Sequence, residues 1–171
     1  HSIQAPAIYN LFAGITFLGS PTFWILLAAT MYWLGKEKAS FFFMNLVVFT
    51  GALVALFKPI FGIARTETAG TAQKIVGFEL YSGLSFPSGH TTTITAVFSY
   101  WSRWMNKRQK WVAVFLVLLV AFSRLYLQVH WLTDVIAGIV LGWLIGKANC
   151  WIVDKMQKRS FRLTEFRDEG A

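Results

Sequence analysis

The protein has 171 residues, of which 56% are hydrophobic and only 14% are charged. Soluble domains carry about 25% charged and about 45–50% apolar residues, so the composition favours a membrane protein over a soluble all-helical core. The length indicates a single domain, residues 1–171. A single cysteine, Cys150, excludes an internal disulfide and cannot form a zinc site alone. The formal net charge is +8, and the placement of the charges decides what it means.

Long apolar runs divide the chain into predicted membrane spans. The first run, within residues 1–17, is too short to cross a bilayer and predicts an interfacial helix, because a span needs about 20 residues. Residues 58–87 predict an outer loop and residues 153–171 a tail. The fold class is therefore an all-α, polytopic transmembrane helix bundle. Its five predicted spans are residues 18–35, 39–57, 86–104, 111–129 and 131–151.

Basic residues gather on one side of this bundle. They lie in the connections after the first and third spans and in the tail, and the positive-inside rule places that side in the cytoplasm. The charge is therefore a topology signal, and no nucleic-acid partner is expected. These residues are Lys36, Lys38, Arg103, Lys107, Arg108, Lys110, Lys155, Lys158, Arg159, Arg162 and Arg167.

Ionisable residues also gather on the opposite side, where they are costly at membrane depth and by default indicate function. Read singly, each has a structural explanation: a lysine that reaches the headgroups, a helix cap, an interface histidine or a polar helix contact. Read together, three cations, two histidines and one carboxylate predict a site for a polyanion. They are Lys58, Arg65, His90, Arg124, His130 and Asp134.

The pattern suits phosphate chemistry. Arginine offers forked contacts to phosphate oxygens and lysine adds a point charge. Pro87, Ser88 and Gly89 open a predicted helix, whose N-terminal amides bind anions. His130 and Asp134 are four residues apart, so they lie one helical turn apart if the fifth span begins near His130, and the carboxylate can then orient a nucleophilic imidazole.

Three segments carry a resemblance to a known family. They are "KPIFGIAR" (58–65), "PSGH" (87–90) and "SRLYLQVHWLTD" (123–134). In this order they resemble the type 2 phosphatidic acid phosphatase (PAP2) superfamily, in its bacterial membrane lipid phosphatase branch. The resemblance covers about residues 15–152. Thr66 stands where the family usually has proline, and the family usually has six spans, so a missing span is expected before residue 1.

The resemblance implies a role for each site residue. His130 is the expected nucleophile that forms a phosphohistidine, Asp134 orients it, and His90 is the general acid. No metal or other cofactor is expected. The expected phosphate-binding groups are Lys58, Arg65, Arg124 and the backbone of Ser88 and Gly89. The glycines at 138, 142 and 146 predict a face for close helix packing.

The expected function is a phosphatase acting on a lipid phosphate or diphosphate in a bacterial inner membrane, with its site facing the periplasm or exterior. Undecaprenyl diphosphate and phosphatidylglycerol phosphate are the favoured substrates, with phosphatidic acid and lipid A also open. One alternative is a lipid phosphotransferase that uses the same phosphohistidine. Another is a lipid-binding or lipid-translocating protein without enzymatic activity. The sequence does not indicate an oligomeric state.

Overall fold

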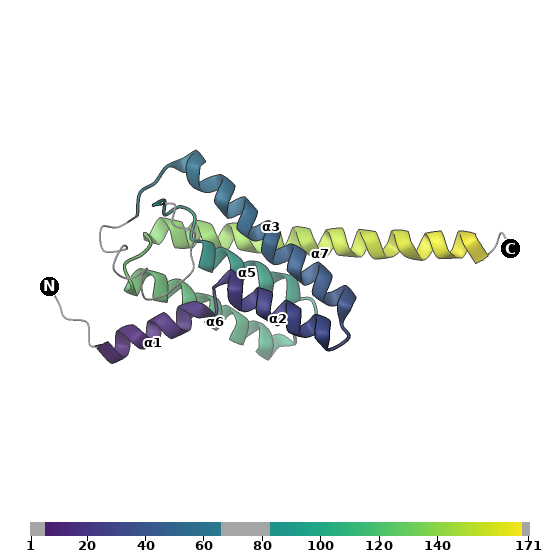
Figure 1. Ribbon diagram of the computed structural model, residues 1–171, viewed down its shortest axis with the longest axis horizontal. Coiled ribbons are helices and arrows are strands. Elements are labelled where there is room, and N and C mark those ends of the chain that lie inside the picture. Colours follow the sequence, from purple (N-terminus) through teal and green to yellow (C-terminus); the bar gives the residue numbers. More distant parts are fainter. Residues whose placement is uncertain (1–5, 66–82, 169–171) are drawn as a thin grey trace.

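The computed structural model describes residues 6–65 and 83–168, and it describes side chains only as far as Met156. These residues form a bundle of α-helices, and the only β-type pairing among them is an isolated bridge between Ala64 and Leu84 (Figure 1). The predicted all-α fold is therefore confirmed. The helices are α1 (Pro6–Phe17), α2 (Pro21–Trp33), α3 (Glu37–Phe61), α5 (Gly89–Trp101), α6 (Lys107–Tyr126) and α7 (Leu132–Asp168).

Among the described residues, three helical segments are long and apolar enough to cross a membrane: α3, α6 and the Leu132–Met156 part of α7. They correspond to the predicted second, fourth and fifth spans. A fourth crossing is possible if α1 and α2, bent by 48° at a short break, act as one broken span. The bundle therefore has three or four such spans by length and composition.

The first predicted span differs from the observed helix. The helix α2 has 13 residues and is about 20 Å long, which is shorter than the hydrocarbon core of about 30 Å. The chain turns at Leu18–Ser20, where Ser20 caps α2 by accepting a hydrogen bond from the Thr22 amide. Pro21 then occupies the first helical turn, where its missing N–H costs nothing. The position of α1 in the membrane interface remains a prediction.

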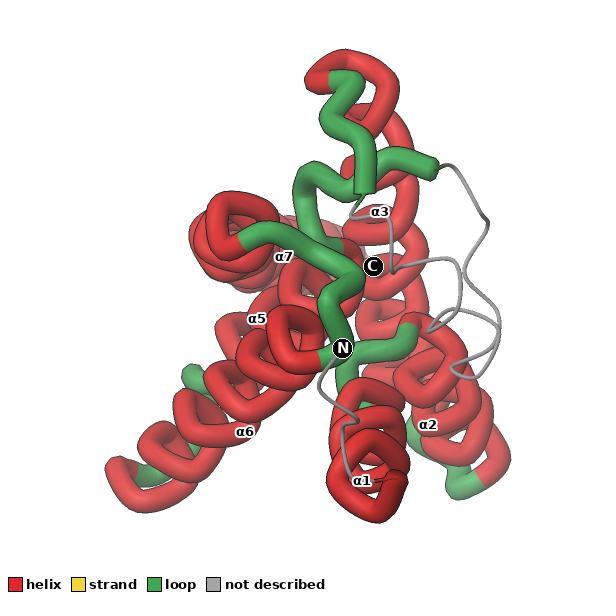
Figure 2. The backbone as a smooth tube through the Cα atoms, turned by 90° about the vertical axis from the view of Figure 1, so that its left-hand side faces the viewer, coloured by secondary structure: helices red, strands yellow, loops and turns green. Residues whose placement is uncertain are grey.

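The third predicted span is also shorter than expected. The helix α5 has 13 residues and lies in the middle of the bundle (Figure 2). Nearly all of its side chains are buried, including the run Thr91–Thr93. Because α3, α6 and α7 all contact α5, it needs no lipid-facing stripe. The hydroxyl groups of Thr92 and Thr95 donate to carbonyl oxygens one turn back, at 2.8 and 2.7 Å. These bonds satisfy polar groups that would otherwise be costly to bury.

The predicted glycine face packs α7 against α5. An added methyl group at Gly138 would lie 3.0 Å from the Ser88 carbonyl oxygen. At Gly142 and Gly146 it would collide with the backbone of α5. Glycine therefore lets the two helix backbones approach closely, which confirms the predicted role of this face.

The helix ends sort into two groups. The segments 62–65, 83–88 and 127–131 meet at the end of the bundle where α5 and α7 begin (Figure 1). The connections between α2 and α3 and between α5 and α6 lie at the opposite end, from which α7 continues outward. Arg103 and Asp154 form an ion pair of 2.8 Å at this opposite end. The first group of ends carries the predicted site residues.

Candidate active site

His130 and Asp134 form a buried pair at the start of α7. The His130 Nδ1 and Asp134 Oδ2 atoms are 3.3 Å apart, and both side chains are fully buried. The same carboxylate oxygen accepts a 2.9 Å hydrogen bond from the amide of Trp131, the residue before the helix. Asp134 thus occupies the third helical position, where an acid side chain can reach back to the preceding amide. This contact fixes the carboxylate and, through it, the imidazole ring.

Arg124 lies on the last turn of α6 and is 2% exposed. Its guanidinium donates a 2.9 Å hydrogen bond from Nη1 to the Thr16 hydroxyl of α1. Phe12 of α1 packs against Phe122 and Tyr126 of α6, and these contacts hold α1 beside the arginine. A buried cation is costly unless it is hydrogen-bonded. The helix α1 therefore helps to hold this charge in place.

Lys58 and Arg65 meet at one backbone carbonyl. The Lys58 ammonium donates to the Leu84 oxygen at 2.7 Å, and the Arg65 Nε donates to the same oxygen at 3.2 Å. Lys58 lies in the last turn of α3, which ends in a left-handed residue at Gly62. The shared acceptor places both cations beside the segment that leads into α5.

Backbone hydrogen bonds join the three motif segments. The Arg65 amide donates to the Gly83 oxygen at 3.1 Å, and the Ser85 amide donates to the Ile63 oxygen at 2.7 Å. The indole N–H of Trp131 donates to the Ala64 oxygen at 3.3 Å, which ties the start of α7 to the same segment. Residues far apart in the sequence therefore meet at one end of the bundle.

His90 is the second residue of α5 and is 3% exposed. Gly19, in the break between α1 and α2, lies directly against it: an added methyl group would be 2.8 Å from His90 Cβ and 3.0 Å from its carbonyl oxygen. The Ser88 amide donates to the Asp134 carbonyl oxygen at 3.1 Å, which joins the start of α5 to that of α7. Of the two predicted amide donors, the Ser88 amide therefore already bonds to the Asp134 carbonyl oxygen, whereas Gly89 is the first residue of α5.

All the predicted site residues lie in the segments that meet at this end of the bundle or in the helix turns next to them. Three further residues support them and were not predicted: Thr16, Gly19 and Leu84. Thr66 lies outside the described residues. The described residues contain no group of three or more histidine, cysteine, aspartate or glutamate side chains arranged to hold a metal. With three cations and one carboxylate, the site has a net positive charge that suits an anionic ligand.

The sequence model of the PAP2 superfamily matches residues 39–158. The chain belongs to the PAP2 superfamily. This confirms the resemblance drawn from the three motif segments, all of which lie in the matched range. The apolar helices and this membership identify the protein as an integral membrane protein.

The relatives of this chain include named lipid phosphatases. Phosphatidylglycerophosphatase B of Bacillus subtilis is 28% identical over 84% of this chain and 74% of its own length. Lipid A 4'-phosphatase of Porphyromonas gingivalis is 42% identical over 36% of this chain, and lipid A 1-phosphatase of the same organism is 34% identical over 61%. The chain spans only 26% and 21% of the length of those two relatives.

A solved PAP2 structure has the same fold. The crystal structure of a transmembrane PAP2-type phosphatidylglycerolphosphate phosphatase from Bacillus subtilis matches with a TM-score of 0.71 and 26% sequence identity. The match covers 90% of this chain and 80% of the other. The transmembrane bundle predicted from the sequence is therefore the architecture of a solved PAP2 enzyme.

Proposed function

We propose that this PAP2 protein is a membrane lipid phosphatase that transfers the phosphoryl group of a lipid phosphate or diphosphate to water. The observation that carries the proposal is the fully buried pair of His130 and Asp134, held 3.3 Å apart at the end of the bundle that carries the other predicted site residues. A carboxylate that fixes one ring nitrogen of histidine orients the other nitrogen for nucleophilic attack and stabilises the charged ring.

In the first step, the Nε2 atom of His130 attacks phosphorus and forms a P–N bond. The bond between phosphorus and the lipid oxygen breaks, and protonated His90 gives its proton to the departing oxygen. Asp134 keeps the proton on Nδ1 of His130 through the observed contact. The products are the dephosphorylated lipid, or a lipid monophosphate from a diphosphate, and a phosphohistidine.

In the second step, water attacks the phosphohistidine. Neutral His90 accepts a proton from the water, the P–N bond breaks, and inorganic phosphate leaves. Through both steps Lys58, Arg65 and Arg124 bind the phosphate oxygens and stabilise their negative charge. The Gly89 amide, at the N-terminus of α5, adds a backbone donor.

The proposed substrates follow from the relatives and the membrane setting. Phosphatidylglycerol phosphate, lipid A phosphates and undecaprenyl diphosphate each join an anionic phosphate to a long apolar body. The basic connections at the opposite end of the bundle support a site that faces the periplasm or exterior of a bacterial inner membrane.

Phosphate release from a panel of these lipids tests the proposal. Wild-type protein in detergent should release phosphate from at least one of them with EDTA present. His130→Ala should lower turnover by about 10⁴-fold or more, because the nucleophile is lost. Transfer of the phosphoryl group to an added lipid alcohol in preference to water would instead identify a phosphotransferase. Turnover near the wild-type rate by His130→Ala would refute the proposed nucleophile.

A further inference from the structure

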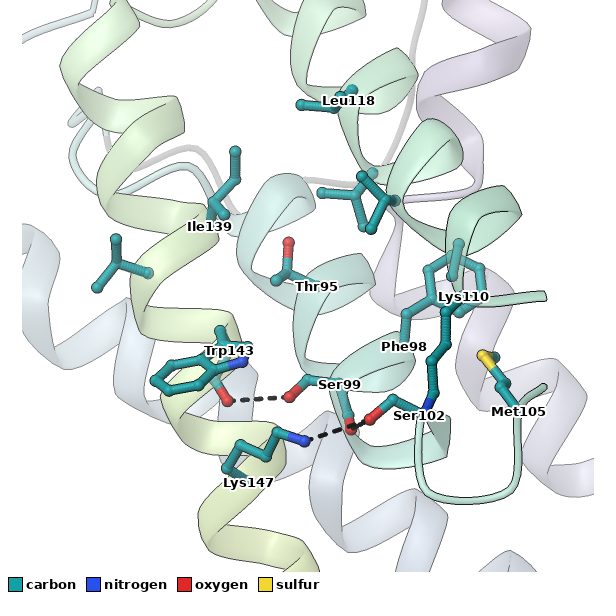
Figure 3. Close-up of a pocket in the computed structure, with 14 residues that line it drawn as sticks. Thr95, Phe98, Ser99, Ser102, Met105, Lys110, Leu118, Ile139, Trp143 and Lys147 are labelled. Carbon is teal, nitrogen blue, oxygen red and sulfur yellow. Dashed lines mark hydrogen bonds between the residues drawn. The ribbon is translucent and has the colours of Figure 1, made fainter. Parts of the chain in front are cut away.

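A cavity of about 650 Å³ lies between α5, α6 and α7 (Figure 3). Its lining comes from the parts of these helices away from His130. Its walls are mainly apolar side chains, with Val114 and Val117 on α6, Ile139 and Trp143 on α7, and Phe98 on α5. The volume falls within the range of about 300–1,000 Å³ that is typical of small-molecule sites.

The cavity follows from how the three helices pack. The α7 glycines hold that helix against α5, and the Ser99 hydroxyl donates to the Trp143 carbonyl oxygen at 3.0 Å. The helix α6 slopes away from α7 toward its own N-terminus, as Figures 1 and 2 both show. The space between α6 and α7 is therefore not filled by these two helices, and α5 lines its third side.

The position of the cavity restricts what can enter it. Both walls belong to segments that are long and apolar enough to span the membrane, namely α6 and Leu132–Met156. Val114 and Trp143 line the cavity and are about half exposed, at 48% and 52%. An occupant must therefore have an apolar body that enters from the lipid phase.

One end of the cavity is cationic. Lys110 and Lys147 both line it, and Figure 3 shows the two side chains directed toward Ser102. The Lys147 ammonium lies 3.4 Å from the Ser102 hydroxyl. Within the part of the chain whose side chains are described, neither lysine pairs with a carboxylate, whereas neighbouring Arg103 lies 2.8 Å from Asp154. Two lysines and a hydroxyl group thus face the same opening.

We propose that this cavity binds an anionic phospholipid from the leaflet opposite the candidate active site. One acyl chain lies along the apolar walls, and Lys110 and Lys147 bind the phosphate of the headgroup. The predicted orientation makes this leaflet cytoplasmic, where anionic lipids attract basic residues. The apolar tail of the proposed substrate fits this cavity less well. With the substrate headgroup at the candidate active site, the far end of its tail would lie against the two lysines.

Native mass spectrometry of the detergent-solubilised protein with phosphatidylglycerol or phosphatidylcholine tests this site. Because phosphatidylglycerol carries a phosphodiester and no terminal phosphate, it serves in this experiment as a ligand and not as a substrate. Wild-type protein should retain one phosphatidylglycerol in preference to phosphatidylcholine. Lys110→Gln with Lys147→Gln should weaken phosphatidylglycerol binding about 30-fold, because each lysine near an anionic headgroup contributes about fivefold. The control pair Lys36→Gln with Lys38→Gln removes the same charge from the same end and should leave binding unchanged.

A second pair of variants tests the apolar part of the site. Val114→Phe adds bulk inside the cavity and should reduce lipid retention, whereas Val112→Phe adds it to an exposed position that does not line the cavity. Equal melting temperatures would show that all these variants fold. Retention of phosphatidylglycerol by the Lys110 and Lys147 double variant at the wild-type level would overturn the proposal. An increase in KM for the lipid substrate in Val114→Phe, without loss of bound phosphatidylglycerol, would also overturn it.

Discussion

Asp134 contacts two groups with one oxygen, the imidazole of His130 and the amide of Trp131. Asp134→Asn keeps the shape of the side chain but removes its charge and can reverse the tautomer of His130. We expect kcat for phosphate release to fall by about 10³–10⁴-fold, as for an orienting carboxylate in a catalytic triad. Asp154→Asn is the matched control on the same helix, since Asp154 pairs with Arg103 at the other end. Comparable losses in both variants would contradict the orienting role.

Thr16 gives Arg124 a hydroxyl acceptor inside the bundle. Thr16→Val keeps the side-chain shape and leaves a buried donor without that acceptor, which costs about 1–3 kcal/mol. We expect kcat/KM to fall by about tenfold, mainly through a higher KM, because Arg124 is proposed to bind the substrate phosphate. Thr16→Ser retains the hydroxyl and should restore activity. Equal kinetics for Thr16→Val and the wild type would argue against a role of the Thr16 hydroxyl in holding Arg124.

Gly19 touches His90 across the break between α1 and α2. Gly19→Ala should displace the histidine and lower kcat/KM by up to about 100-fold, because small misplacements of catalytic groups are costly. Gly14→Ala is the control, since a methyl group there meets nothing within 4 Å. Kinetic measurement of both variants separates a local displacement from a general effect of alanine in this segment. Full activity of Gly19→Ala would contradict the expected displacement of His90.

The sequence could predict the motif residues but not the residues that support them. Lys58, His90 and His130 stand out because ionisable groups are rare in apolar segments. Thr16 carries no such signal: it is an ordinary hydroxyl residue 108 positions from Arg124, and only the packing of α1 on α6 brings the two together. Gly19 has a weak local signal, since Gly-Ser-Pro inside an apolar run often marks a break.

At the scale of the elements, the contact between α5 and α7 positions both histidines. The Ser88 amide binds the Asp134 carbonyl, and Gly142 allows the backbones of the two helices to approach. Apolar run lengths predicted helices here, but they overestimated α5, since a helix enclosed by protein need not match the bilayer thickness. The break before α2 was missed for a similar reason, because hydropathy does not register a bend.

Gly142→Ala tests the contact between α5 and α7. The added methyl group would overlap the Thr92 carbonyl group and force the helices apart, which should destabilise the protein by about 1–3 kcal/mol. The melting temperature should therefore fall by several degrees. Gly51→Ala in α3 is the control, because its methyl group meets nothing within 4 Å and alanine favours a helix. A melting temperature for Gly142→Ala at or above that of Gly51→Ala would contradict the packing account.

At the scale of the whole molecule, the two ends differ in chemistry. One end holds the buried histidines and their cations, and the other holds the basic connections and the long extension of α7 (Figure 1). The sequence predicted this division because charge placement follows membrane topology. It could not predict the cavity beside Lys110 and Lys147, which depends on the slope of α6 against α7.

Thiol labelling in intact cells tests the predicted orientation. In a Cys150→Ser background, Ile63→Cys should react with a membrane-impermeant reagent, because it lies at the end that carries the candidate site. Lys107→Cys, at the opposite end, should react only after the membrane is permeabilised. The reverse pattern would place the candidate site in the cytoplasm and contradict the predicted orientation.

The most direct test of the account is to trap the phosphoryl group on the protein. Wild-type protein mixed with a lipid labelled in its terminal phosphate should be quenched in base, where phosphohistidine survives, and the labelled peptide identified by mass spectrometry. The account predicts a label on His130 that forms before phosphate release and is absent from His130→Ala. A label on a different residue, or rapid turnover with no labelled protein, would contradict it.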